Sequence, residues 1–463
     1  MAFSVDGQHV VVAGAGQSGI AAAELLISKG ALVTLADTAA SIDGARTLRN
    51  LGVQLELGPH RADLFAKADL VVLSPGVSPH QDAVRAARTA GVPVIGEIEL
   101  ASRWIEGRVI AITGTKGKST TTTLTALMLR EAGLPAVAGG NLGPALSSQV
   151  ATSTADTIHV VEVSSFQLET TDTFHPSIAV VLNLSPDHLD RHASFEEYRA
   201  AKARIFTNQT ADDWAVINAG DPAAVSLAAG TRAARFDYAL DAPMLSQRDL
   251  EVDGVTIDGD AIVRRTRGAS SPLLPVAAVR LPGRHLLSDV LAAAAVCCLA
   301  GVPAPAMARA VSQFTGLEHA LETVAEVGGV RFVNDSKATN IASARQSIES
   351  FERGVVAIMG GRFKGGRFED LRESVPGRVA AIVAIGEARP LIHAALGDLV
   401  PVHDAATMSE AVSRAFASAA PGGCVLLAPA CSSFDMFQDY RARGRAFTAE
   451  ARRLEAEGTA RVE

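Results

Sequence analysis

The amino-acid sequence predicts an α/β protein of three domains: a Rossmann-like N-terminal domain, a central P-loop-type mononucleotide-binding sheet with a small antiparallel accessory sheet, and a Rossmann-like C-terminal domain. Short apolar runs alternate with helical periods along almost the whole chain, which is typical of parallel sheets covered by helices. The 463 residues, 48% of them hydrophobic, are enough for several cores. The strand-like runs are HVVVAGAG (9–16), ALVTLAD (31–37), LVVLSPG (70–76), VIAITGT (109–115), HVVEVSS (159–165), IAVVLNLS (178–185), GVVAIMGG (354–361), AAIVAIG (380–386) and GCVLLAPA (423–430).

Breaks in this alternation set the expected domain boundaries. A first unit ends near residue 97, and a second begins before the basic loop that follows residue 113. Residues 235–280 interrupt the pattern with Asp/Gly turns and short alternating strands, which predict the antiparallel accessory sheet. The βα pattern then restarts at Gly316. We therefore expect domains at 1–97, 98–315 and 316–463.

Composition excludes several classes of protein. The net charge is −8, so the chain has no general basic surface for nucleic acid. No run approaches the roughly 18–20 apolar residues of a membrane span, and the N-terminus leads into a strand without a basic, apolar leader. We expect a cytoplasmic monomer that binds neither nucleic acid nor a membrane. The cysteines form no C-x-x-C pair and are expected to be reduced and to act as small apolar residues: Cys297, Cys298, Cys424 and Cys431.

The first predicted strand ends in a glycine-rich turn, GAGQSG (14–19), and the next strand ends in Asp37. This is the dinucleotide fingerprint: glycines allow close approach, a helix N-terminus faces a pyrophosphate, and an acid binds ribose hydroxyls. NAD and a UDP group satisfy it equally well, and a tight turn without a ligand is the alternative. SPG (74–76), after another strand, is positioned to line the same crevice.

The segment VIAITGTKGKSTTTT (109–123) is the most informative one. An apolar strand leads into a loop bracketed by Gly114 and Gly117, whose backbone N–H groups can face an anion at a helix N-terminus. Lys118 supplies a positive charge, and the serine or threonine after it supplies a hydroxyl for Mg²⁺. This shorter variant of the P-loop predicts a nucleoside triphosphate site. The alternative is a plain strand-to-helix turn with solvated lysines.

Three further polar residues follow in the central region. Glu162 ends a buried strand, where a carboxylate suits Mg²⁺ together with phosphate oxygens, although it could be a solvated strand-end acid. His188 lies among polar residues after the next strand and could bind a second metal or a substrate, or be structural. Lys202, in a helical pattern, reads by itself as a solvated helix charge.

The last domain contains three polar strand-to-helix junctions. They are NDSKATN (334–340), GGRFKG (360–365) and PACSSFD (429–435). Each offers charged or hydroxyl groups near a helix N-terminus, which favours anions. Any one alone would be an ordinary loop, but three in one domain predict a pocket for a small anionic substrate.

Together these segments resemble the Mur ligase family over essentially the whole chain. The resemblance rests on GTKGKST (114–120), GGNLG (139–143), EVSSFQLE (162–169), LNLSPDHLDRH (182–192), YRAAKARI (198–205), NDSKATN (334–340) and PACSSFDMFQDYRARGRAF (429–447). The last two are most similar to the segments of family members that add D-glutamate.

The resemblance implies an ATP-dependent amide ligase that joins D-glutamate to UDP-N-acetylmuramoyl-L-alanine through an acyl phosphate, in peptidoglycan precursor synthesis. The first domain would hold UDP, the central one ATP with two Mg²⁺ ions, and the last one D-glutamate. In the family, the lysine that matches Lys202 is carbamylated by CO₂. The resemblance therefore implies a carbamate on Lys202, in place of the solvated charge that its pattern suggests.

The resemblance also implies a role for each matching residue. The catalytic residues would be Lys118, Glu162, His188, Lys202 and Lys337. ATP would contact Gly114, Thr115, Lys116, Gly117, Lys118, Ser119, Thr120, Asp289 and Asp335. The UDP-linked substrate would contact Ser18, Asp37, Thr38, Gly76, Asn141, Ser164 and His188. D-Glutamate would contact Thr339, Lys364, Ser433, Phe434 and Tyr440. The metal ions would be held by Ser119, Thr120, Glu162, His188 and Lys202.

The chain departs from the family pattern around the expected adenine site. The usual G-x-H-N-x-x-N reads GRHLLSD (283–289), so both asparagines are replaced, and Ala320 replaces the arginine of G-L-P-H-R. Lys116 replaces the commoner asparagine of the phosphate loop. We expect the phosphates to be held as in the family and the base to be recognised differently, with Asp289 accepting from the adenine amino group.

Three other functions remain open from the sequence. One is a Mur or folylpolyglutamate-type ligase with a different acceptor. Another is a nicotinamide-dependent oxidoreductase, which would use the first glycine-rich turn and leave the 114–120 loop unexplained. The third is a non-catalytic nucleotide-binding relative, suggested by the departures around adenine.

Overall fold

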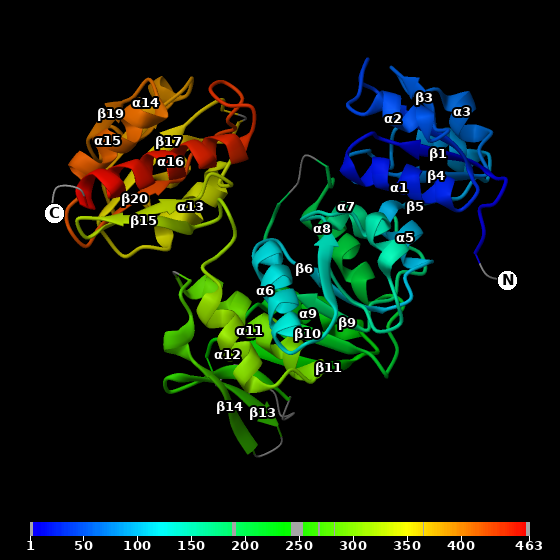
Figure 1. The fold of residues 1–463 in the computed structure, drawn as a ribbon, viewed down its shortest axis with the longest axis horizontal. Helices are drawn as coiled ribbons and strands as arrows, with labels where there is room; N and C mark the ends of the chain where they lie inside the picture. The colour runs from blue at the N-terminus through cyan, green and yellow to red at the C-terminus, as the bar shows by residue number, and fades with distance from the viewer. Residues whose placement is uncertain are drawn as a thin grey trace. The chain divides into compact units, whose positions relative to one another are not determined.

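The computed structural model describes residues 3–187, 191–241, 253–266, 269–281, 283–363 and 365–459 (Figure 1). Two compact units make up the chain: residues 1–279 with 287–313, and residues 280–286 with 314–463. The first unit contains a five-stranded and a nine-stranded sheet, and the second contains a six-stranded sheet. The predicted three-domain α/β class is therefore confirmed.

The N-terminal sheet consists of parallel strands with helices between them. Its elements are β1 His9–Ala13, α1 Gln17–Ser28, β2 Leu32–Asp37, α2 Ala45–Asn50, β3 Gln54–Leu57, α3 Ala62–Ala66, β4 Leu70–Leu73, α4 Asp82–Thr89, β5 Val94–Gly96 and α5 Glu97–Ser102. In β1, Val10 and Val12 pack in one apolar cluster and Val11 in another, because successive side chains point to opposite faces. In the strand order β3-β2-β1-β4-β5, the chain adds β2 and β3 on one side of β1 and then β4 and β5 on the other side. The switch point of the sheet therefore lies between β1 and β4. Ligands of such sheets bind at this switch point, where the glycine-rich turn lies.

Two buried glutamates of α5 join the N-terminal sheet to the central region. Glu99 accepts hydrogen bonds from three successive backbone N–H groups, those of residues 172–174, at 2.8–3.0 Å, and from the Arg103 guanidinium at 2.9 Å. Burial raises the pKa of Glu99, but the hydrogen bonds together outweigh it and hold that pKa below its ordinary value. Glu97 accepts from the backbone N–H of Ser147 at 2.6 Å, and burial raises its pKa.

The opposite pKa shifts of these two glutamates predict opposite responses to amide substitution. Glu99→Gln is expected to lower the free energy of unfolding by about 3 kcal/mol at pH 7, because an amide would face backbone donors. Glu97→Gln, the matched control, is expected to change it by less than about 1 kcal/mol, since this site favours the uncharged form. Urea denaturation measures both, and equal losses would contradict the assignment.

The pH dependence of the Glu99 effect follows from the direction of its shift. A lowered folded-state pKa gives stability that is fully present above the unfolded value, near 4.5, and is lost as the pH falls through the folded value. The difference between the wild-type chain and Glu99→Gln should therefore shrink below pH 4.5.

The central sheet has the strand order β14-β13-β12-β11-β10-β9-β6-β8-β7. Its strands are β6 Arg108–Thr113, β7 Ala136–Gly140, β8 Ile158–Glu162, β9 Ile178–Val181, β10 Trp214–Asn218, β11 Ala234–Ala239, β12 Gly254–Asp258, β13 Ala261–Thr266 and β14 Ala269–Pro275. Its helices are α6 Lys118–Glu131, η1 Leu146–Thr152, α7 Ser165–Leu168, α8 Phe195–Ala203, η2 Arg204–Phe206, α9 Pro222–Leu227, η3 Ala228–Gly230, η4 Val276–Ala278, α11 Arg284–Leu299 and α12 Ala304–Gln313.

The predicted antiparallel strands are present, but they continue the central sheet. β13 pairs antiparallel with both β12 and β14. β12 pairs parallel with residues 237–239 of β11. Backbone hydrogen bonding therefore runs without a break from the parallel to the antiparallel part. The accessory strands form an edge of this sheet.

The C-terminal sheet has the order β15-β16-β20-β17-β18-β19, with β15 antiparallel to β16 and the other pairs parallel. Its elements are β15 Glu322–Val327, β16 Val330–Asn334, α13 Ile341–Glu349, β17 Val355–Gly360, η5 Phe368–Leu371, β18 Val379–Ile385, α14 Arg389–Leu396, β19 Val402–Asp404, α15 Met408–Ser418, β20 Cys424–Leu427 and α16 Tyr440–Thr459. The five strands from β16 to β19 in this order are thus parallel and end at one edge, which brings their following loops together.

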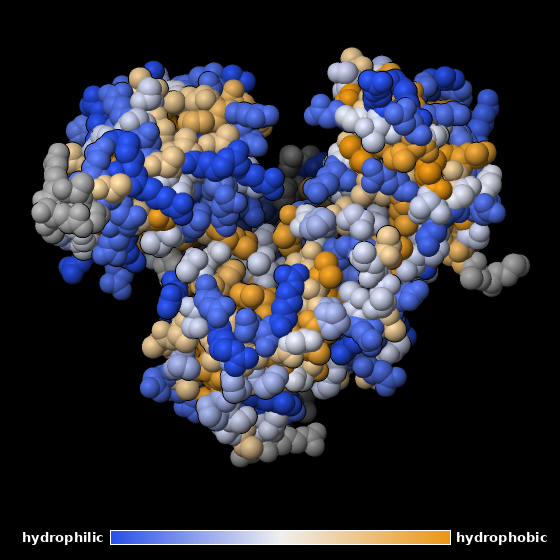
Figure 2. Space-filling view, in the orientation of Figure 1, coloured by the Kyte–Doolittle hydropathy of each residue, from blue (hydrophilic) through white to orange (hydrophobic). Residues whose placement is uncertain are grey.

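On the face shown in Figure 2, hydrophilic residues are interspersed with smaller groups of apolar residues. No helix in the described ranges has the length and apolar character needed to cross a bilayer. All four cysteines, each within a described range, carry free thiols, as predicted.

Candidate active site

The loop after β6 has the geometry of a phosphate-binding turn. Gly117 is the N-cap of α6 and has a φ of +84°, a left-handed conformation that favours glycine. Asn183, beyond the end of β9, holds the loop from one side. Its side chain accepts from the backbone N–H of Lys116 at 2.9 Å and donates to the carbonyl of Lys116 at 3.1 Å. The turn is therefore fixed by the protein's own contacts at the N-terminus of α6, a position that favours an anion.

The Lys118 side chain bends back so that its ammonium group contacts the backbone of this turn. It donates to the carbonyls of Gly114 and Thr115 at 3.0 and 2.9 Å. A positive charge is thereby held at the loop, next to the helix N-terminus, where negative charge is stabilised.

Glu162 lies beside the loop because β8 is a neighbour of β6 in the sheet. The residue is 2% exposed, and its carboxylate accepts from the Ser119 hydroxyl at 2.6 Å and from the Asn141 amide at 2.7 Å. Thr120, the next residue of α6, is half-buried. Among the described residues, no three His, Cys, Asp or Glu side chains converge on a metal site. The oxygen donors of Glu162 and Ser119 fit Mg²⁺, which takes a few protein oxygens together with substrate phosphates.

Lys202 is buried, so its interpretation as a solvated helix charge is wrong. Its side chain, from α8, is on a residue only 2% exposed. The amine donates to the Thr113 hydroxyl at 3.1 Å and to the carbonyl of Gly114 at 2.9 Å, and it lies 4.8 Å from the centre of the Tyr198 ring. Burial, reinforced by the charge of Lys118, lowers the pKa of Lys202 well below its ordinary value of 10.5. This environment favours a neutral, nucleophilic amine.

Two residues that were predicted to contact the substrate, Asn141 and Ser164, form hydrogen bonds within the protein near Glu162. Asn141 orients the Glu162 carboxylate, as its hydrogen bond shows. Ser164 forms a capping box with Gln167 at the start of α7. The prediction for His188 lies outside the described residues.

The predicted UDP edge of the N-terminal sheet is closely packed. A Cβ on Gly19 would lie 1.8 Å from the carbonyl oxygen of Gly14, so only glycine lets α1 start this close to β1. The Asp37 carboxylate accepts from the backbone N–H groups of Ala15 and Ala39 at 2.6 and 2.8 Å, which ties the glycine-rich turn to the end of β2. The remaining predicted residues here are Ser18, half-buried, and Thr38 and Gly76, exposed.

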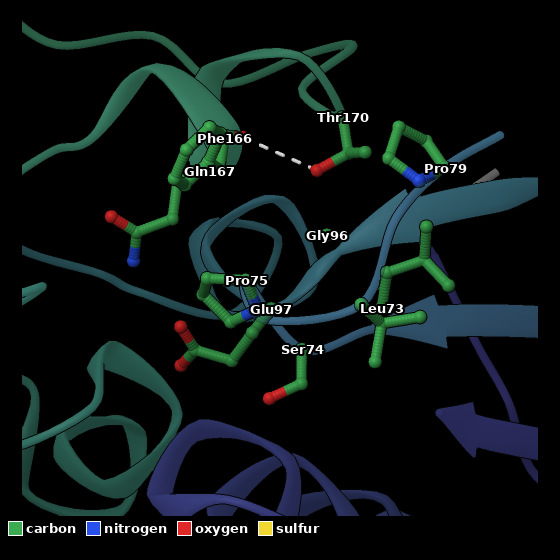
Figure 3. A pocket seen from close by; sticks show the side chains of 10 residues that line it. Leu73, Ser74, Pro75, Pro79, Gly96, Glu97, Phe166, Gln167 and Thr170 are labelled. Carbon is green, nitrogen blue, oxygen red and sulfur yellow. Dashed lines mark hydrogen bonds between the residues drawn. The ribbon is translucent and has the colours of Figure 1, made fainter. Parts of the chain in front are cut away.

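A small pocket lies between the end of β4 and α7, and Figure 3 shows the Glu97 carboxyl and the Gln167 amide among its side chains. Its volume, about 10 Å³, suits one water molecule. Glu97 Oε2 and Gln167 Nε2 are buried and have no hydrogen-bond partner among the described residues. The pocket is too small for a substrate.

The three predicted junctions of the C-terminal domain follow the adjacent strands β16, β20 and β17. Backbone hydrogen bonds join them: Ala430 N–H donates to the Ala338 carbonyl at 2.9 Å, and Arg362 N–H donates to the Ser432 carbonyl at 3.0 Å. The sheet thus brings together loops that are far apart in the chain.

Arg443, which the sequence analysis did not single out, connects two of these loops. It is 1% exposed, and its guanidinium donates to the Ser336 hydroxyl at 3.0 Å, the Ser336 carbonyl at 2.9 Å and the Cys431 carbonyl at 3.0 Å. Burial lowers its pKa to about 10, so it remains a cation at neutral pH. Its segment, YRARGRAF, is charge-rich and resembles a solvated helix face, and no local signal marks this arginine as buried.

The other residues predicted in this domain differ in exposure. Asp335 accepts from the backbone N–H of Leu321 at 3.3 Å and from the Ser347 hydroxyl, so its carboxylate joins the ends of β16 and α13 to the start of β15. Lys337 is exposed. The predicted D-glutamate contacts are Thr339 and Tyr440, half-buried, Ser433, buried, and Phe434, exposed, while Lys364 lies outside the described residues.

The fold and the phosphate loop are those of a nucleotide-binding α/β protein, and the relatives show that the chain is a ligase of the Mur ligase family. Three family models match it in order: the Mur ligase MurD-like N-terminal domain over residues 8–96, the Mur ligase middle domain over 112–297, and the Mur ligase glutamate ligase domain over 321–431. Two curated relatives are named UDP-N-acetylmuramoylalanine–D-glutamate ligase. The one from Acidobacterium capsulatum is 43% identical and covers 96% of each chain. The one from Geotalea daltonii is 41% identical and covers 98% of this chain and 99% of the relative.

Solved structures share the fold at lower identity. A UDP-N-acetylmuramate-alanine ligase from Thermotoga maritima aligns with a TM-score of 0.59 at 19% identity, covering 97% of this chain and 99% of the other. A pseudomurein peptide ligase type C from Methanothermus fervidus aligns with a TM-score of 0.57 at 16% identity and the same coverage. These likenesses show the fold alone.

Proposed function

We propose that this chain joins D-glutamate to UDP-N-acetylmuramoyl-L-alanine in peptidoglycan precursor synthesis, converting ATP to ADP and phosphate. One observation carries the proposal: Lys118, Glu162 and Lys202 converge at the loop after β6. They do so in a chain that is 41–43% identical, over nearly its whole length, to relatives named for this reaction.

The chemistry needs an activated carboxylate, because a carboxylate is a poor electrophile. Transfer of the γ-phosphoryl group of ATP to the L-alanyl carboxylate gives an acyl phosphate and ADP. The amine of D-glutamate then attacks the carbonyl carbon, the C–N bond forms, a proton is lost from nitrogen, and phosphate leaves. Lys118 and the N-terminus of α6 stabilise the charge on the transferred phosphoryl group.

The residues around Glu162 suit a magnesium ion. Mg²⁺, when bound, neutralises charge on the β- and γ-phosphates. Glu162 and Ser119 would hold it, with Thr120 next to them on α6. Asn141 keeps the carboxylate of Glu162 oriented through its hydrogen bond, as supporting groups of metal sites do. A second ion near His188 remains a prediction.

The environment of Lys202 supports the proposed carbamate. In that reaction the neutral amine adds to the carbon of CO₂, an N–C bond forms, and a proton leaves the nitrogen. The proton passes to solvent, and the product is a carbamate anion in place of the neutral amine, beside the loop where the metal is proposed. The depressed pKa of Lys202 favours the neutral amine that this addition requires.

The proposal also assigns residues to UDP, to ATP and to D-glutamate. UDP would lie along the edge formed by the glycine-rich turn and Asp37. ATP would contact the 114–120 loop and Asp289, and Asp335 is predicted as a further ATP contact. D-Glutamate would lie among the loops that Arg443 connects, with Lys337 near the acyl phosphate. Domain boundaries at 97 and 315, a monomeric state and a cytoplasmic location belong to the same proposal.

Phosphate release from ATP tests this function. The assay contains UDP-N-acetylmuramoyl-L-alanine and one acceptor at a time: D-glutamate, L-glutamate, L-lysine or diaminopimelate. We expect turnover with D-glutamate alone. Turnover with another acceptor would assign a different ligase activity, and no turnover with any acceptor would overturn the proposal.

A further inference from the structure

The carboxyl group of Asp289 lies directly against Gly117 of the phosphate loop. Asp289 is on α11 and is 5% exposed. A Cβ placed on Gly117 would be 2.1 Å from its Oδ1 and 2.9 Å from its Oδ2. The carboxyl group therefore fills the space that a side chain at position 117 would occupy. Glycine is required there both by this contact and by the φ of +84°.

Asp289 contacts a different part of the loop from the one that Asn183, Lys118 and Lys202 hold. Asn183 binds Lys116 from the β9 side, and Lys118 and Lys202 both donate to the carbonyl of Gly114. These contacts fix the first half of the turn. Asp289 packs on Gly117, the N-cap of α6, at the positive end of the helix dipole.

The surroundings of Asp289 favour a carboxyl group that does not repel phosphate. Burial raises its pKa to about 8, although the nearby charge of Lys118 opposes this shift. The other titratable group close to it is Tyr238, which is fully buried and whose pKa is raised far above its ordinary value by burial and then by Asp289. At neutral pH much of Asp289 is therefore uncharged.

We infer that Asp289 is a positioning residue that holds Gly117 and thereby sets the affinity of the loop for a triphosphate group, whatever base is attached. This differs from the expectation that its carboxylate reads the adenine amino group. The inference rests on the proposed function only in taking ATP as the nucleotide.

Inorganic triphosphate separates the two roles because it has no base. Dissociation constants of the magnesium complexes of ATP, ITP and inorganic triphosphate are measured by calorimetry on the full chain and on Asp289→Ala and Asp289→Asn. We expect Asp289→Ala to weaken all three by the same factor, about tenfold, since the loop is no longer held. Asp289→Asn, which keeps the size of the side chain, should recover much of this loss while the ratio of ATP to triphosphate affinity stays constant.

Cys297→Ala is the matched control for loosened packing. Cys297 lies on the same helix, is fully buried, and contacts the Thr125 carbonyl of α6 through its sulfur at 3.9 Å. This variant is expected to lower the melting temperature without changing triphosphate affinity.

Two results would overturn the inference. In one, Asp289→Ala weakens ATP but not triphosphate, which would assign base reading. In the other, the dissociation constants of all three ligands change no more in Asp289→Ala than they do in Cys297→Ala. A wild-type chain that binds triphosphate but does not ligate D-glutamate would overturn the proposed function while supporting this inference.

Discussion

Lys118→Ala is expected to reduce the rate of ADP formation by about 10³-fold, because it removes a positive charge from the loop proposed to hold the phosphoryl group that moves. The structure adds a second reason. The Lys118 ammonium bonds the carbonyls of Gly114 and Thr115, so the variant also loses the contacts that hold the turn closed. Single-turnover measurements with saturating ATP separate the chemical step from weaker binding.

Two companion variants sharpen this test. Lys118→Arg should not restore the rate, because a planar guanidinium does not replace a compact ammonium in a tight turn. Lys67→Ala, at an exposed lysine after α3, controls for the loss of one positive charge. A loss below about tenfold in Lys118→Ala would contradict the role given to this residue in phosphoryl transfer.

Lys202→Ala is expected to reduce activity by about 10²-fold or more, and small carboxylates such as formate or acetate should restore part of it. An added carboxylate would fill the space left by the side chain and replace the proposed carbamate anion. The wild-type chain should lose activity when CO₂ and bicarbonate are removed and regain it when they are returned. Both effects are measured as rates of phosphate release.

Lys118→Ala serves as the control for this rescue, since a carboxylate cannot replace a cation. Rescue of Lys118→Ala as well would indicate a general salt effect. Absence of any rescue of Lys202→Ala at high carboxylate would contradict the carbamate, whereas the burial of Lys202 would stand.

The strands were predictable because the signal is local. Apolar runs such as HVVVA and IAVV are short, and parallel strands buried on both faces show them without alternation. The extension of the central sheet by β12–β14 was harder to predict. It depends on a parallel pairing of residues 237–239 with 254–256, which no local pattern records.

The phosphate loop was predictable from its glycines and lysine, but its supports were not. Lys202 reads as an exposed helix charge until α8 packs it against a loop that lies 88 residues earlier in the chain. Asn141 resembles a substrate contact in sequence, while in the structure its amide binds Glu162. Arg443 is hidden for the same reason: whether a charged residue in a helix is buried depends on what packs against that helix.

The position of β6 between β9 and β8 has a consequence for how the chain acquires its affinity for nucleotide. During synthesis the 114–120 loop emerges first, but Glu162, Asn183 and Lys202 emerge much later, and Asp289 later still. Contacts between such distant segments form slowly, because the chain loses conformational entropy in closing a long loop before the contacts can stabilise it. Triphosphate binding should therefore appear only after the centre of the sheet has assembled, which makes a bound nucleotide a reporter of completed folding.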